Sequence, residues 1–113
     1  ERVAARVPGV FSPPEYYRAS TADHAAALRA RGFTDAQIGR HAGLADTTLM
    51  LALDASLVRA DRLAKSAGEG ADGDASRADA ALGQAAVDRI VAVTVQAIRA
   101  RTAGREGKPQ SKP

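Results

Sequence analysis

The spacing of apolar residues changes early in the chain. Apolar residues recur at every second position over residues 3–7, which predicts a short β-strand that ends before Pro8. The apolar spacing then changes to three and four residues, which is typical of helices. Ser20, followed three residues later by Asp23, has the spacing of a capping box. We therefore expect a helix that begins at Ser20 and ends at Gly32.

A second capping-box pattern and a glycine divide the next part of the chain. Thr34 with Gln37 predicts a short helix that runs toward residues 39–41, and Gly43 then supplies a break. Residues 46–53 contain neither glycine nor proline and are apolar on almost every side of a helix. Because such a helix is normally buried, we expect it to be covered by something larger than this chain.

The C-terminal half contains one glycine-rich loop and one long amphipathic helix. In "KSAGEGADGDASRADAAL", Gly68, Gly70 and Gly73 lie among small and acidic residues, which predicts a loop of about ten residues. Ser76 and Asp79 are predicted to cap a last helix over residues 77–101, which has a wide apolar face.

The charge of the chain is concentrated at its C-terminus. The 113 residues carry a net charge of +3, and residues 101–113 account for it with four basic residues against one glutamate. The composition of this end predicts a solvated, disordered tail over residues 103–113, after a single small domain over residues 1–102. We therefore expect no nucleic-acid partner.

Composition also limits the compartment and the kind of core. Apolar residues make up 45% of the chain, but many are alanines, so the core should be modest. There is no cysteine and no apolar run of about 20 residues. We therefore expect a cytoplasmic protein with no membrane partner. The chain starts at Glu1, and its one methionine is Met50, so we expect it to begin partway along a gene product.

Candidate chemistry lies in the loop "RHAGLADTT". His41 can hold or deliver a proton near neutral pH, and the Asp46 carboxylate can orient a histidine or bind a divalent cation. The alternative is ordinary packing, in which Asp46 caps the following helix and His41 caps the end of the preceding one.

A helix-turn-helix DNA-binding module is another interpretation of the same stretch, because residues 28–53 have the corresponding order of helices and turn. However, residues 42–57 contain no Arg, Lys, Asn or Gln with which to contact base edges.

Three blocks of the chain resemble the creatininase family of metal-dependent amidohydrolases. They are "YYRASTADHAAALRARGFTDAQI", "GRHAGLADTTLMLALDASLVR" and "GADGDASRADAALGQAAVDRIV", which occur in this order between residues 14 and 102. The resemblance implies an α/β fold, with this chain as the helix-rich C-terminal portion of a three-layer αβα domain. It also implies hydrolysis of the C–N bond of a small, in some members cyclic, amide.

The resemblance also implies roles for individual residues. His41 and Asp46 would be catalytic, with Arg40, Gly43 and Thr47 binding substrate. Asp46 stands where the family usually has glutamate, and Arg40 stands where several members have an acidic residue.

The family's metal, zinc or manganese, would be held mostly by residues upstream of this chain, with Asp46 as the one ligand offered here. His24 lies in a predicted helix and is expected at the surface. The partners implied are the N-terminal half of the same enzyme, as a separate or cleaved chain, further copies in a homo-oligomer, and a small amide substrate. The third interpretation is a noncatalytic subunit that kept the fold.

Overall fold

The structure, a computed structural model, describes residues 9–106. The N-terminal arm consists of α1 (Pro14–Arg18), the π-helical segment η1 (Ala19–Asp23) and α2 (His24–Ala30). The short α3 (Asp35–Ile38) and α4 (Leu44–Leu53) follow, and then three 3₁₀ segments, η2 (Ala55–Leu57), η3 (Ala60–Lys65) and η4 (Ala75–Arg77). The last element is α5 (Ala80–Glu106).

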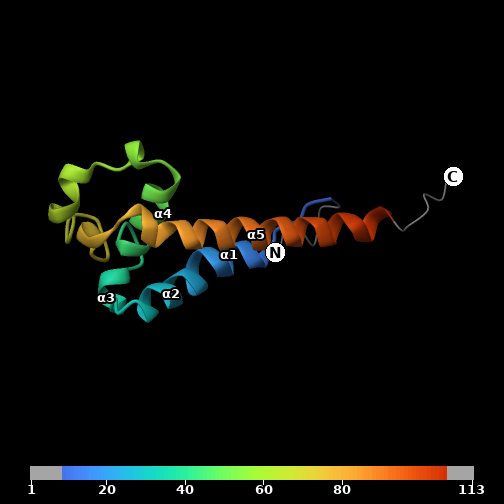
Figure 1. The fold of residues 1–113 in the computed structure, drawn as a ribbon, viewed down its shortest axis with the longest axis horizontal. Helices are drawn as coiled ribbons and strands as arrows, with labels where there is room; N and C mark the ends of the chain where they lie inside the picture. Colours follow the sequence, from blue (N-terminus) through green and yellow to red (C-terminus); the bar gives the residue numbers. More distant parts are fainter. Residues whose placement is uncertain (1–8, 107–113) are drawn as a thin grey trace.

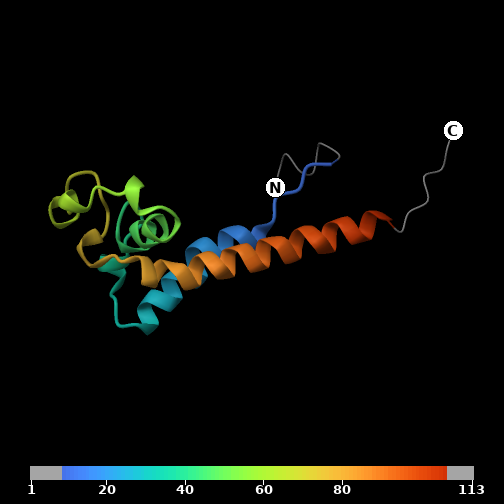
Figure 2. The same cartoon turned by 45° about the horizontal axis from the view of Figure 1, so that its top comes forward.

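The long helix α5 organises the molecule. In Figure 1, α1 and η1 run beside α5, α2 turns away from it, and the segments between α2 and α5 gather around its N-terminal end. Figure 2 shows that the C-terminal half of α5 extends beyond the other helices. The described part of the chain is therefore a small helical cluster with a long projecting helix.

The expected three-layer αβα fold is wrong. Within residues 9–106 there is no strand, and the β-type pairing consists of two isolated bridges, His41 with Asp72 and Ala67 with Ala71. These residues form an all-α structure because their apolar positions recur at three- and four-residue spacing, with leucine and alanine prominent among them. The strand predicted over residues 3–7 lies outside the described residues.

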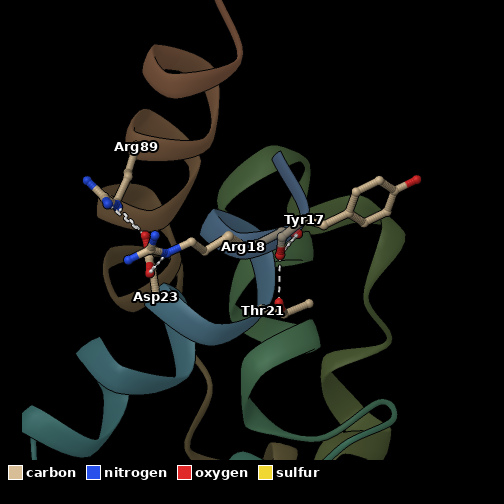
Figure 3. A network of polar contacts seen from close by, with 6 residues as sticks. Tyr17, Arg18, Thr21, Asp23 and Arg89 are labelled. Carbon is tan, nitrogen blue, oxygen red and sulfur yellow. Dashed lines mark hydrogen bonds and ion pairs between the residues drawn. The ribbon is translucent and has the colours of Figure 1, made fainter. Parts of the chain in front are cut away.

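The first helix begins earlier than predicted. Pro13 is its N-cap and Pro14 its first residue, a position where the missing N–H of proline costs nothing. Ser20 is therefore not a cap. The Ser20 hydroxyl instead donates back to the carbonyl of Tyr17 at 3.2 Å, inside the continuous helix. The Thr21 hydroxyl donates to the same carbonyl at 2.6 Å (Figure 3).

The second capping box is confirmed. The Gln37 N–H donates to Thr34 Oγ1 at 3.3 Å, and the Thr34 N–H donates to Gln37 Oε1 at 2.9 Å. The break at Gly43 is also present, as the N-cap of α4.

The last helix is confirmed with changed ends. Asp79 accepts from the Leu82 N–H at 2.9 Å, whereas Ser76 lies in the preceding 3₁₀ segment η4. The helix continues to Glu106, so residues 103–106 of the predicted tail are helical. Residues 107–113 lie outside the described residues.

The core of the helical cluster is small. Leu28, Ile38 and Leu44 are buried together, with half-buried apolar residues packed around them. Helix α4 crosses α5 closely at Gly83, where a Cβ would overlap the carbonyl of Thr48. Of the helix expected to be buried on all sides, Leu53 is 64% exposed. Asp46, Met50 and Leu53 are the exposed residues of α4, so this helix is not buried on all sides.

His24 belongs to this interior, so the expectation that it lies at the surface is wrong. It is 2% exposed, and its Nε2 lies 3.0 Å from Thr48 Oγ1 and 3.2 Å from the carbonyl oxygen of Ala45. Because a carbonyl can only accept, we assign the ring proton to Nε2. Burial disfavours the charged imidazolium and holds the pKa of His24 below its usual value.

We therefore predict that acid destabilises the fold through His24. Below about pH 6.5, the ordinary pKa of histidine, the unfolded chain binds a proton that the folded chain excludes, so stability falls as pH falls. Thermal unfolding followed by circular dichroism at pH 7.5 and 5.5 measures this loss. His24→Gln keeps a donor near Thr48 but does not titrate, so its melting temperature should change less between the two pH values. An equal change in both proteins would contradict the prediction.

One further property of α5 concerns membranes. Residues 80–103 form a helix long and apolar enough to cross a bilayer, by length and composition alone, although the sequence showed no run that suggested a span. Asp88 and Arg89 lie within it, and charged residues in a bilayer are costly. The absence of a membrane partner stays a prediction.

Candidate functional site

The loop between α3 and α4 has an unusual backbone conformation. Ala42 has a φ of +51°, in the left-handed region that residues with a side chain rarely adopt. Its N–H donates to Asp46 Oδ2 at 2.8 Å. Asp46 is the third residue of α4, whose N-cap is Gly43, so the interpretation of Asp46 as the N-cap is wrong. The carboxylate instead stabilises the strained turn that precedes the helix.

His41 is fixed through its backbone. Its carbonyl accepts from the Asp72 N–H at 2.7 Å, and its N–H donates to the Asp72 carbonyl at 3.3 Å. The residue is exposed, and α3 ends with Gly39 as its C-cap, so His41 does not cap that helix. The glycine-rich segment near Asp72 therefore holds the His41 backbone while the imidazole remains accessible.

A cavity of about 360 Å³ lies beside this loop, within the size range of small-molecule sites. It is formed by the α3–α4 loop, α4 and the segment from η2 to η4. Most of the lining surface is apolar, and the lining residues with polar side chains are His41, Asp46, Thr47, Arg59, Arg62 and Ser66.

The structure thus brings together three of the five residues expected at the site, His41, Asp46 and Thr47. The Thr47 hydroxyl lies 3.5 Å from the Ala42 carbonyl, at the limit of a hydrogen bond. No hydrogen bond joins the His41 and Asp46 side chains among the contacts of the described residues. The aspartate therefore positions the loop and not the imidazole.

Arg40 and Gly43 lie outside this cavity. The Arg40 Nε donates to Asp72 Oδ2 at 2.8 Å from a side chain that is 90% exposed, and Arg40 lines a separate hollow toward α2. A Cβ on Gly43 would overlap the backbone of Ile38 and Gly73. Gly43 therefore serves the close packing of two loops.

Sequence reasoning missed the two arginines and the serine that line the cavity. Arg59 precedes η3 and Arg62 lies within it, three residues later. The Ser66 hydroxyl donates to the Leu63 carbonyl at 2.8 Å. The available signal was the pair of arginines spaced by three in "VRADRL", which places two cations near each other. It did not indicate that they would face the His41 loop.

The residues of this cavity do not by themselves fit a divalent metal. Over residues 9–106, no group of three or more His, Cys, Asp or Glu side chains is placed to hold an ion. One oxygen of Asp46 already accepts the Ala42 N–H, and the neighbouring arginines favour anions. Zinc or manganese would need ligands from elsewhere.

Helices α3 and α4 are the elements on which the helix-turn-helix interpretation depends. In a helix-turn-helix module α4 would be the helix that contacts bases, but it contains no Arg, Lys, Asn or Gln. The helix before it, α3, has four residues. The geometry thus gives a small-molecule cavity more support than a nucleic-acid interface. Comparisons of the chain with protein-family models, with curated proteins and with solved structures find no match.

Proposed function

We propose that this chain provides the substrate-binding and proton-transfer part of a hydrolytic site for small amides. The observation that carries the proposal is the cavity that His41 and Asp46 share with Arg59 and Arg62. Its volume suits a small molecule, and its groups combine a proton carrier with an anion-binding pair. The resemblance of residues 39–59 to creatininases adds support for the amide bond as the target, although the αβα fold it implied does not hold.

Each group has a distinct part in this proposal. The imidazole of His41 delivers a proton to the leaving nitrogen or takes one from the attacking water. Arg59 and Arg62 bind a carboxylate or another anionic group of the substrate. Asp46 holds the turn that carries His41, through the Ala42 N–H. The apolar part of the lining, which includes Met50 and Leu63, packs against the uncharged part of the substrate.

A second chain completes the site in this proposal. The cavity is open to solvent, and His41 and Arg59 are both exposed. Catalytic sites usually exclude water around the reacting bond, and this chain does not. Any zinc or manganese ion would be held by the completing chain, so the chemistry assigned to this chain does not pass through a metal.

Binding of a simple probe tests the cavity without the second chain. N-acetylglycine joins an amide to a carboxylate, and Met50, the one methionine, lies in the cavity wall. In protein labelled with ¹³C at the methionine methyl, we expect a single signal that shifts saturably on titration. Replacing both arginines, Arg59→Gln with Arg62→Gln, should weaken binding by about tenfold or more, since each removes a charged hydrogen bond.

Arg40→Gln is the matched control, because it removes an exposed arginine that does not line this cavity. It should leave the titration unchanged. Acetamide, which lacks the carboxylate, should bind more weakly than N-acetylglycine to the unmodified chain. The proposal fails if Met50 shows no saturable shift, or if Arg40→Gln weakens binding as much as the double replacement.

A further inference from the structure

Helix α5 carries a stripe of exposed apolar residues. Val91, Val95 and Ile98 are 55%, 38% and 46% exposed, and their spacing of four and three residues places them on one face of the helix. Other residues of α5 pack against α4, α1 and η1. The stripe is therefore an exposed part of a helix whose other residues belong to the fold.

This stripe continues onto the neighbouring helices. Val91 lines one hollow with Tyr16 and Leu53, and a second with Tyr16 and Val95. Tyr16 is 42% and Leu53 is 64% exposed. We call these five residues, Tyr16, Leu53, Val91, Val95 and Ile98, the outer face. An apolar surface contributed by three helices is typical of a protein-binding site.

Charged residues of opposite sign lie at the two ends of the stripe. Asp88 precedes Val91 by three residues and accepts a hydrogen bond from Gln84 at 2.9 Å. Arg99 directly follows Ile98, and no ion pair engages it among the described residues. Two such helices placed in opposite directions bring each acidic end beside a basic end. Placed in the same direction, they bring Asp88 against Asp88.

We propose that two copies of this chain associate through their outer faces, with the two α5 helices antiparallel. Val91 of each copy packs against Val95 of the other, and Asp88 of each copy lies within reach of Arg99 of the other. Leu53 and Tyr16 pack along the edges of the helix pair. This association does not depend on the cavity beside His41, which lies near the other end of α5.

A protein partner fits α5 better than a lipid bilayer does. Arg89 donates to Asp23 Oδ2 from its Nε at 2.9 Å and from its terminal nitrogen at 2.6 Å, and Arg18 also pairs with Asp23, at 3.4 Å (Figure 3). The hydrogen bond from Arg89 holds the pKa of the Asp23 carboxyl below its usual value. This charged cluster joins the middle of α5 to η1, and a bilayer around α5 would have to enclose it.

Charge exchange tests both the partner and the orientation. Sedimentation equilibrium of the full chain over a range of concentrations should give a monomer–dimer equilibrium. Asp88→Arg alone and Arg99→Asp alone should each weaken dimerisation by about tenfold or more, because each places like charges together. The two changes in one chain restore opposite charges and should recover most of the affinity. Asp61→Arg, on η3, is the matched control and should leave dimerisation unchanged.

A second variant tests whether the apolar stripe is needed for dimerisation. Val91→Ser with Val95→Ser should give a monomer whose helix content by circular dichroism is unchanged, because both residues are exposed in the single chain. A chain that is monomeric at every concentration would overturn the proposal, and so would a double exchange that does not recover affinity. Vesicles of phosphatidylcholine and phosphatidylglycerol test a membrane as the alternative partner. If the chain binds these vesicles but does not dimerise without them, and if the Val91→Ser, Val95→Ser variant does not bind them, the outer face contacts a membrane and the dimer proposal is overturned.

Discussion

Replacing Leu28 with alanine is expected to lower the free energy of unfolding by about 2–5 kcal/mol, the usual cost of emptying a large buried site. Leu28 is fully buried and is one of three residues at the centre of the core. A core of this size has little surplus stability, since small domains are only marginally stable. Urea denaturation followed by circular dichroism gives the free energy, and a large part of the variant should already be unfolded without urea.

Leu57→Ala is the control for this loss. It removes the same side chain from a residue that is 65% exposed, so its cost should stay within about 0.5 kcal/mol. A cost below about 1 kcal/mol for Leu28→Ala, equal to that of the control, would mean that residues 28, 38 and 44 do not form the stabilising core.

Local signals in the sequence were reliable where a cap is built from near neighbours. Thr34 and Gln37 complete their capping box within four residues, and Asp79 caps α5 through an N–H three positions away. Ser20 carried the same signal and was misleading. It lies inside a longer helix whose start is set by Pro13 and Pro14, and its hydroxyl bonds to a backbone carbonyl of that helix. A capping pattern therefore predicts a helix start only where the chain before it is not helical.

The fold class was wrong because it came from resemblance and not from the spacing of residues. The helical periodicity over residues 20–53 and 77–101 was visible in the sequence, and the sheet was expected from the resemblance. The position of His24 could not be read from its neighbours either. Small alanines surround it on several sides of the helix, so the pattern does not show which side is buried. Contact with Thr48, 24 residues later, decides it.

Only the part of the site that is built from residues close together in the sequence was predictable. His41, Asp46 and Thr47 lie within seven residues and reach the same cavity through one turn and the start of α4. Arg59 and Arg62 join them because the 3₁₀ segments after α4 fold back beside it. That return path depends on packing between distant segments, for which no nearby residue gives a signal.

His41→Ala is expected to lower turnover of a small amide by the completed enzyme by about 10²-fold or more, the usual scale for a general acid or base. The imidazole is exposed, and the contacts described for His41 are made by its backbone, so the variant should fold normally. Steady-state kinetics and the melting temperature, measured on the same preparation, separate the two effects.

Asp46→Ala should behave differently because the carboxylate acts on the loop. It removes the acceptor of the Ala42 N–H and should cost about 1 kcal/mol of stability as well as activity. Asp46→Asn keeps an oxygen that can accept from Ala42, so it should recover stability and much of the turnover. If His41→Ala retains turnover near that of the unmodified enzyme, the catalytic role of His41 fails. If N-acetylglycine still binds but the completed enzyme hydrolyses no amide, the chain is a noncatalytic subunit that binds small molecules.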